Sequence, residues 1–92
     1  MSLGQIVISK KGRDKGRAMV VLSIEPDKHT TAIWLTLVDG KMRTLLKPKK
    51  KKAMHVQPTN TIVDLTYVGP RGLQDADIRK MLGEEVSPLG QR

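Results

Sequence analysis

The residues of this sequence that could do chemistry are mainly cations, and they gather in two blocks. Residues 10–17 carry a net charge of +4 and residues 41–52 carry +7, whereas the remainder of the 92-residue chain sums to −3. Blocks of a single sign create a field that attracts polyanions; a solvated surface or a localisation-type run is the alternative interpretation. Because each block lies beside a turn, we favour a patch that binds an acidic partner. Its candidate residues are Lys10, Lys11, Arg13, Lys15, Arg17, Lys41, Arg43, Lys47, Lys49, Lys50, Lys51 and Lys52.

Chemistry beyond the binding of anions finds little support. The chain has no Cys, which rules out thiolate nucleophiles, thiolate metal sites and disulfides. His29 and His55 fall in different predicted loops without the spacing of metal ligands. Asp14 lies among cations, so it should stay ionised and serve to accept hydrogen bonds from its loop or to orient Arg13 and Arg17. We therefore expect no enzymatic activity, no metal, no cofactor and no small-molecule substrate.

Aromatic side chains are almost absent, which bears on how a nucleic acid would be held. Trp34 and Tyr67 are the two aromatic residues of the chain, which has no Phe. Tyr67 is expected in the core with Val63 and Leu65. Trp34 lies opposite the main apolar face of its segment, and it either packs against the domain or meets one base. A platform of several stacking aromatics is excluded, so we expect recognition of phosphates, 2′-hydroxyls and RNA shape.

Alternating apolar residues predict about five short strands that position these cations. The second of them has Ala18, Val20, Leu22 and Ile24 on its buried face. Asp39-Gly40 predicts a two-residue hairpin turn, which requires positive φ at both positions. The strands are expected near residues 5–10, 17–25, 31–38, 41–46 and 61–68, and five strands at this spacing are typical of a small barrel filled by its own side chains.

Two features of the predicted barrel concern the second basic block. The strand that follows the hairpin, over residues 41–46, is expected to point Met42 and Thr44 inward. Pro48 should end that strand because it cannot donate to a ladder. Residues 49–52, four consecutive lysines, are then predicted to form an exposed loop of point charges.

The C-terminal part of the chain departs from the strand pattern. Residues 75–82 predict a short helix in which Asp75 is the cap, Ile78, Met81 and Leu82 share a face, and Gly83 is the end. We expect this face to pack on the barrel. The predicted organisation is therefore a barrel over residues 1–68, followed over residues 69–92 by a linker, the helix and a flexible tail.

The chain also lacks the patterns that lead proteins to or through membranes. No apolar run approaches the length of a membrane span, and no signal peptide opens the sequence. A basic amphipathic helix suited to anionic lipid is missing as well. We expect a basic cytoplasmic protein without a membrane partner.

Residues 4–24, two alternating segments around a basic loop, resemble a KOW motif. In that family the loop is closed by a signature glycine, which Gly16 matches. Residues 39–43, 47–52 and 55–59 extend the resemblance to stand-alone bacterial KOW-domain RNA-binding proteins. These are similar in turn to KOW-containing large-subunit ribosomal proteins of archaea and eukaryotes. The match covers about residues 3–68, and residues 70–92 follow no pattern of the family.

The resemblance implies a mainly β, five-stranded SH3-like barrel that binds structured RNA, with ribosomal RNA as the expected target. Arg43 and residues 47–52 match the second basic element of the family, and its loop is matched by Lys11, Arg13, Asp14, Lys15 and Gly16. The function expected is ribosome-associated RNA binding in translation, through phosphate contacts of two basic loops, with ribosomal proteins as further partners. The alternative is a protein-interaction module that docks on the translation or transcription machinery, using the apolar face of the C-terminal helix.

Overall fold

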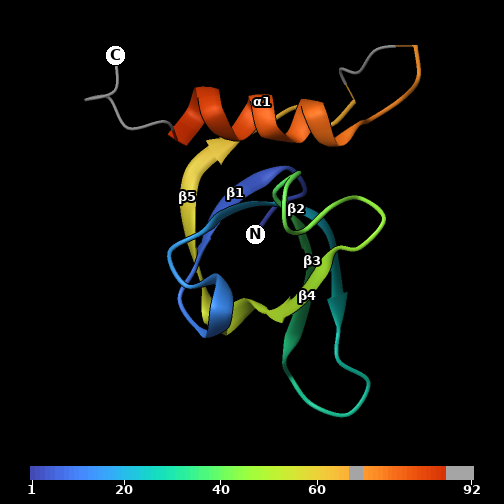
Figure 1. Cartoon of the computed structure of the whole chain (residues 1–92). Coiled ribbons are helices and arrows are strands. Elements are labelled where there is room, and N and C mark those ends of the chain that lie inside the picture. The colour runs from blue at the N-terminus through green and yellow to red at the C-terminus, as the bar shows by residue number, and fades with distance from the viewer. Residues whose placement is uncertain (67–69, 87–92) are drawn as a thin grey trace.

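The chain forms a curled antiparallel sheet with one α-helix at its C-terminal side (Figure 1). The computed structural model describes residues 1–66 and 70–86, with the backbone alone for residues 84–86, so Tyr67 and residues 87–92 lie outside the described residues. The predicted mainly β fold with a C-terminal helix is confirmed, and it is consistent with an SH3-like barrel. The elements are β1 (Gln5–Ser9), the 3-10 helix η1 (Gly12–Asp14), β2 (Ala18–Pro26), β3 (Ile33–Val38), β4 (Lys49–Lys52), the 3-10 helix η2 (Ala53–His55), β5 (Val56–Ile62) and α1 (Asp75–Val86).

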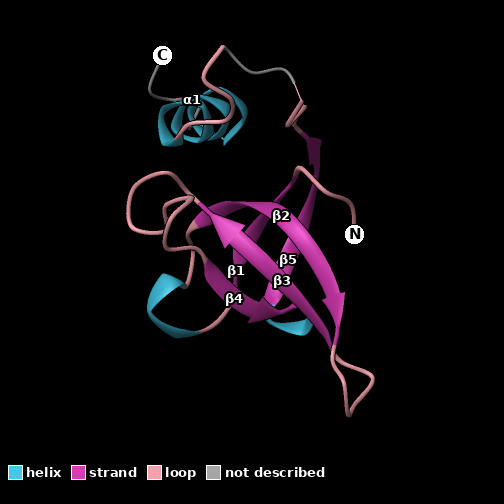
Figure 2. Cartoon of the chain, turned by 90° about the vertical axis from the view of Figure 1, so that its right-hand side faces the viewer, coloured by secondary structure: helices cyan, strands magenta, loops and turns pink. Residues whose placement is uncertain are grey.

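The order of strands in the sheet is β4-β3-β2-β1-β5, and all pairs are antiparallel. Because β1 pairs with both β2 and β5, the first and last strands along the chain lie side by side. The register shifts between Val21 and Ser23 of β2, which inserts Leu22 as a bulge. A bulge bends the strand and increases its twist, which helps the sheet to close on itself (Figures 1 and 2).

Each face of the sheet contributes to its own hydrophobic core. The interior of the barrel holds Val7, Met19, Val21, Leu35, Leu37 and Val56. The opposite face is covered in part by α1, and there Ile6, Val20 and Val38 pack against Ile78 and Leu82 of the helix. Neighbouring residues in β1 and β2 therefore point into different cores.

This arrangement corrects the prediction of one buried face for the second strand. Ala18, Val20 and Leu22 pack beneath α1, whereas Ile24 packs in the barrel interior with Val21. The bulge at Leu22 is the physical reason, because one extra residue moves every following side chain to the other face.

The helix α1 begins at Asp75, as predicted, but it is longer than predicted and Asp75 is not its cap. It runs past Leu82 to Val86, so Gly83 lies within the helix. The side chain of Asp75 accepts the backbone N–H of Leu45 at 2.8 Å, outside the helix. The backbone N–H of Gln74 instead donates to Asp77 Oδ2 at 2.9 Å, which is half of a capping box.

The connection between β3 and β4 is the largest correction to the predicted fold. Residues 41–46 form no strand, and the lysines expected in a loop are themselves strand β4, paired with residues Trp34–Leu37 of β3. The two-residue turn fails because only Gly40, at φ +79°, has a positive φ there. Met42 is 68% exposed, whereas an inward position was predicted.

Gly40 is required where this connection meets the helix. A Cβ on Gly40 would lie 2.6 Å from the backbone oxygen of Asp75 and 2.8 Å from Cγ of Arg79. A hydrogen bond strengthens the same contact: Arg79 Nη1 donates to the Gly40 carbonyl at 2.6 Å.

Among the described residues, no helix is both long and apolar enough to cross a membrane.

Candidate nucleic-acid interface

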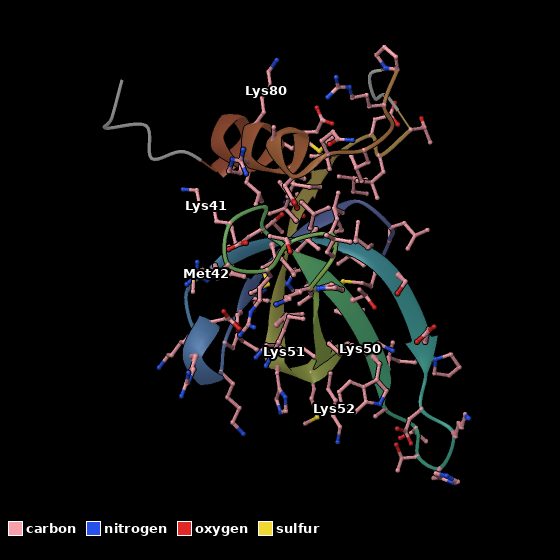
Figure 3. All side chains as sticks on the ribbon, turned by 45° about the vertical axis from the view of Figure 1, so that its right-hand side comes forward. Lys41, Met42, Lys50, Lys51, Lys52 and Lys80 are labelled. Carbon is pink, nitrogen blue, oxygen red and sulfur yellow. The ribbon has the colours of Figure 1, made fainter. Side chains whose placement is uncertain are left out.

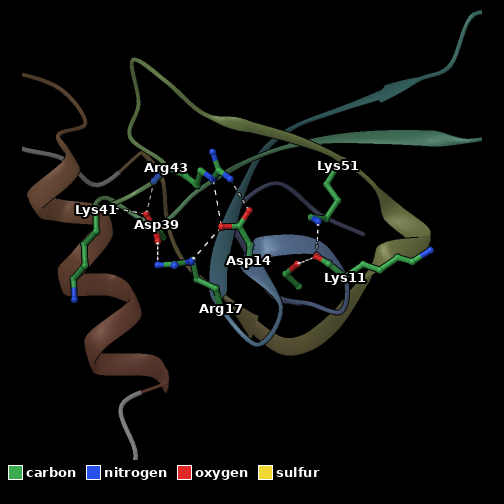
Figure 4. Close-up of polar contacts among 8 residues, drawn as sticks. Lys11, Asp14, Arg17, Asp39, Lys41, Arg43 and Lys51 are labelled. Carbon is green, nitrogen blue, oxygen red and sulfur yellow. Dashed lines mark hydrogen bonds and ion pairs between the residues drawn. The ribbon is translucent and has the colours of Figure 1, made fainter.

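The two basic blocks of the sequence meet at one end of the barrel, where the loop around η1 lies against β4 and η2. Lys51 is only 8% exposed, and its Nζ donates to the backbone carbonyl of Lys11 at 2.9 Å (Figure 4). The backbone N–H of Lys10 donates to the carbonyl of His55 at 2.8 Å. We call Lys10, Lys11, Lys51, Lys52 and His55 the basic cluster.

The lysines of the basic cluster act together on His55. Burial and the charges of the four lysines of the cluster lower the pKa of His55 below its usual 6.5. A histidine among cations is easier to keep neutral because a further positive charge would be repelled. The same field attracts an anion to this end of the barrel.

Beside the basic cluster lies a network of two aspartates and two arginines (Figure 4). Arg43 donates from Nη2 to Asp14 Oδ2 at 2.9 Å and from Nε to Oδ1 at 3.4 Å. Arg17 Nε lies 3.3 Å from Asp14 Oδ1, and Arg17 Nη1 donates to Asp39 Oδ2 at 3.1 Å. We call Asp14, Arg17, Asp39 and Arg43 the ionic network.

Asp14 holds this network together from a buried position. Its burial would by itself raise the pKa, but the hydrogen bond and charge of Arg43, with the charges of Arg17 and Lys49, lower the pKa below the usual 3.8. The prediction that Asp14 stays ionised and orients Arg17 is therefore confirmed. Arg13 is exposed and takes no part, so the predicted pairing of Asp14 with Arg13 is wrong.

Asp39, predicted as a turn residue, fastens the loop that follows β3. Its Oδ1 accepts the backbone N–H groups of Lys41 at 2.9 Å and Arg43 at 2.8 Å. Its other oxygen reaches Arg17, so one carboxylate joins the β3–β4 loop to the start of β2. The Asp-Gly pair of the sequence signalled a turn, but nothing in its spacing signalled the distant arginine.

The four lysines of β4 alternate between the two faces of the strand, so they are not four equivalent charges. Lys51 points inward beside Leu35, as its burial shows. Lys50 and Lys52 point outward (Figure 3); Lys50 forms an exposed ion pair with Glu25 at 3.3 Å. Lys52 Nζ lies 5.5 Å from the ring centre of Trp34.

Most of the other predicted site residues are exposed, with side chains that form no hydrogen bond or ion pair to a described residue: Lys10, Lys11, Arg13, Lys15, Lys41 and Lys47. Lys49 is half-buried and equally unpaired within the described ranges. Gly16 is exposed at φ +85°, and a Cβ added there would have no neighbour within 4 Å, so its conformation alone requires glycine. The unpaired cations are the ones left for an external anion.

Trp34 is fixed at the edge of this surface by a residue that the sequence did not single out. Asp27 Oδ1 accepts Trp34 Nε1–H at 2.8 Å, and Asp27 Oδ2 accepts the N–H groups of His29 and Thr30. The hydrogen bond from Trp34, followed by that from His29, lowers the pKa of Asp27 to about 2.

Across residues 1–66 and 70–83, no group of three His, Cys, Asp or Glu side chains is placed to hold a metal ion.

Fold and surface together define a small basic β-barrel domain in which the two basic blocks of the sequence meet through Lys51 and Lys11. Compared with known proteins, the chain is similar to large ribosomal subunit protein eL14 of Desulfurococcus amylolyticus, at 29% identity over 85 residues. The aligned residues make up 91% of this chain and 78% of that protein, so the similarity extends into the C-terminal part for which the KOW resemblance supplied no pattern. No family model matches the chain. The similarity supports the ribosomal side of the resemblance, and membership of the stand-alone bacterial group stays a prediction.

Proposed function

We propose that this chain is a cytoplasmic, non-enzymatic RNA-binding protein that holds structured ribosomal RNA by its phosphate backbone. The observation that carries the proposal is the meeting of two basic blocks, about 40 residues apart, at one end of the barrel through the Lys51–Lys11 bond. Lys10, Lys11 and Lys15 of the first block are exposed and unpaired among the described residues. The similarity to a large-subunit ribosomal protein supports ribosomal RNA as the target.

The cations divide into two kinds of contact. Lys10, Lys11 and Lys15 are mobile point charges suited to phosphates, and the glycines of their loop allow close approach of a backbone. Arg43 is a fixed fork, because Asp14 engages its Nε and Nη2 and leaves Nη1 for an external acceptor. If about five to seven phosphates are neutralised, log affinity falls with log salt at a slope of roughly −4 to −6.

The rival function, docking of a protein on the C-terminal helix, loses its main support in this structure. Ile78 and Leu82 are buried in the second core, and Met81 packs against it. The predicted packing of the helix on its own barrel is thereby confirmed. Of these three residues, only the half-buried Met81 has side-chain surface left for a partner.

The test is RNA affinity as a function of salt for a variant of the basic loop. Lys10→Gln with Lys15→Gln should weaken binding to a hairpin RNA and make the salt slope shallower by roughly 1 to 2. Arg71→Gln with Lys80→Gln is the matched control, since it removes the same charge; Lys80 lies at the opposite end of the molecule from β4 (Figure 3). Equal effects of the two double variants would contradict the proposed interface. Lys51 is unsuited to this test because its burial ties it to folding.

The identity of the RNA needs a second experiment. Cross-linking in cells, followed by sequencing of the attached RNA, should recover ribosomal RNA. Enrichment of messenger or small RNA would refute the ribosomal target and leave the phosphate-binding surface in place.

A further inference from the structure

One row of side chains crosses three strands on the outer face of the sheet. Trp34 of β3 is directly opposite Glu25 of β2 on one side and Lys52 of β4 on the other. An anion, an aromatic ring and a cation thus stand side by side. Lys52 also belongs to the basic cluster, so the row is continuous with the candidate phosphate-binding surface.

Trp34 serves neither hydrophobic core. Leu35 and Leu37, its neighbours in β3, fill the barrel, and Val38 packs beneath α1. The helix therefore covers the outer face at the Val38 end of the strand and leaves the Trp34 end open (Figure 2). The sole tryptophan of the chain is half-buried on a polar stretch of sheet.

The ring is also held in one orientation before any ligand arrives. Its Nε1–H is bonded to Asp27, and Asp27 is held in turn by the N–H and Oγ of Thr30 and by the N–H of His29. Lys52 is half-buried and lies near the ring as a cation–π partner, a weak contact that a phosphate can replace. A fixed ring beside a mobile cation is the arrangement that stacks a base and meets its phosphate.

We propose that Trp34 is the stacking site for one unpaired nucleobase of the bound RNA. The base lies on the indole, and Lys52 leaves the ring to contact the adjoining phosphate. Lys52 and the rest of the basic cluster lie on the β4 side of the ring, whereas the β2 side carries Glu25 in its pair with Lys50, so the backbone passes over the β4 side. This inference rests on the proposed RNA binding and adds a base contact to a surface otherwise suited to the backbone.

The experiment uses the intrinsic fluorescence of the protein, because Trp34 is the only tryptophan. The probes are a hairpin RNA with one bulged cytidine and the same hairpin fully paired, each unlabelled, with affinity measured separately by filter binding. The bulged hairpin should quench Trp34 emission along its binding curve. The paired hairpin should bind with little change in emission.

Variants of the strand then test the energy of the contact. Trp34→Leu should weaken binding of the bulged hairpin by roughly 5- to 100-fold and leave the paired one unchanged, whereas Trp34→Phe should retain most of the affinity. Thr36→Val, two residues along the same outer face, is the matched control and should bind like the parent. Circular dichroism and thermal unfolding of each variant show whether it is folded.

The outcomes distinguish a failure of the stacking site from a failure of the proposed RNA binding. Binding of both hairpins with unchanged emission, or a folded Trp34→Leu variant with parental affinity for both, overturns the stacking site alone. Failure of the parent protein to bind either hairpin or ribosomal RNA overturns both proposals.

Discussion

The ionic network makes a quantitative prediction for Asp14→Asn. The substitution keeps the shape of the side chain and removes its charge. It weakens two hydrogen bonds from Arg43, at 2.9 and 3.4 Å, and the ion pair with Arg17 at 3.3 Å. Because Asp14 is only 3% exposed, little water reaches the position of its carboxylate.

The expected loss follows from the burial of each partner. Breaking a fully buried ion pair costs about 3–5 kcal/mol. The side chains of Arg43 and Arg17 are 29% and 36% exposed, so both can recover part of their hydration. We therefore expect the free energy of unfolding to fall by about 2–3 kcal/mol, and the melting temperature of a domain of this size by roughly 10–20 °C.

Urea and thermal unfolding at neutral pH measure this loss. Glu25→Gln is the control, since it breaks an ion pair in which Lys50 and Glu25 are 63% and 60% exposed. That variant should lose at most about 0.5 kcal/mol. If Asp14→Asn costs no more than Glu25→Gln, the network does not stabilise the fold and this reasoning is wrong.

The pH dependence gives an independent check on the same residue. The pKa of Asp14 is lower in the folded chain than its usual 3.8, so the unfolded state takes up the proton first on acidification. The stability due to the carboxylate is thus complete above about pH 5 and is lost as the pH falls through the folded-state pKa. The difference between the parent and Asp14→Asn should shrink in that acid range, and a gap that stays constant down to about pH 2 would contradict the assignment.

Three further predictions follow from burial, close approach and charge. Lys51→Ala should cost about 1–2 kcal/mol in urea unfolding because it removes a buried stem and a hydrogen bond, whereas Lys50→Ala should stay within about 0.5 kcal/mol. Gly16→Ala should cost about 1–2 kcal/mol for its positive φ alone; Gly40→Ala should cost about 1–3 kcal/mol more, since its Cβ meets the backbone of α1. In NMR titrations His55 should have a pKa below 6.5 that rises when RNA neutralises the surrounding lysines. RNA affinity should therefore increase from about pH 7.5 to about pH 6, an increase that His55→Gln abolishes.

The sequence predicted the structure correctly where a single interaction between residues close in the sequence determines the local conformation. Alternating apolar residues predicted the β fold, and the shared face of Ile78, Met81 and Leu82 predicted the packing of α1, because burial of a periodic face is the main local signal. The sequence was a poorer guide wherever residues distant in the sequence determine the local conformation. Whether β2 changes face after Leu22 depends on its pairing with β3, which no local pattern encodes.

The lysine run shows the same limit at the candidate site. Four consecutive lysines have no alternation and low strand propensity, so a loop is the natural prediction from composition. They form an edge strand because β3 offers an unpaired row of backbone groups, and lysine is a residue that protects such an edge from further pairing. Pairing then sends Lys51 inward and Lys52 outward, so identical residue types acquire different roles.

Charge counted along the sequence therefore overstates the charge that an RNA meets. The charges of Arg17 and Arg43 are partly neutralised by Asp14 and Asp39. Lys51 is buried, and Lys50 is paired with Glu25. What the ionic network supplies in exchange is rigidity, since it joins the η1 loop, the start of β2 and the β3–β4 loop through two carboxylates. An interface that is held in place before binding loses less entropy when RNA orders it. In the proposed RNA binding, the acids within this basic surface would therefore favour binding by positioning the cations, although they lower its net charge.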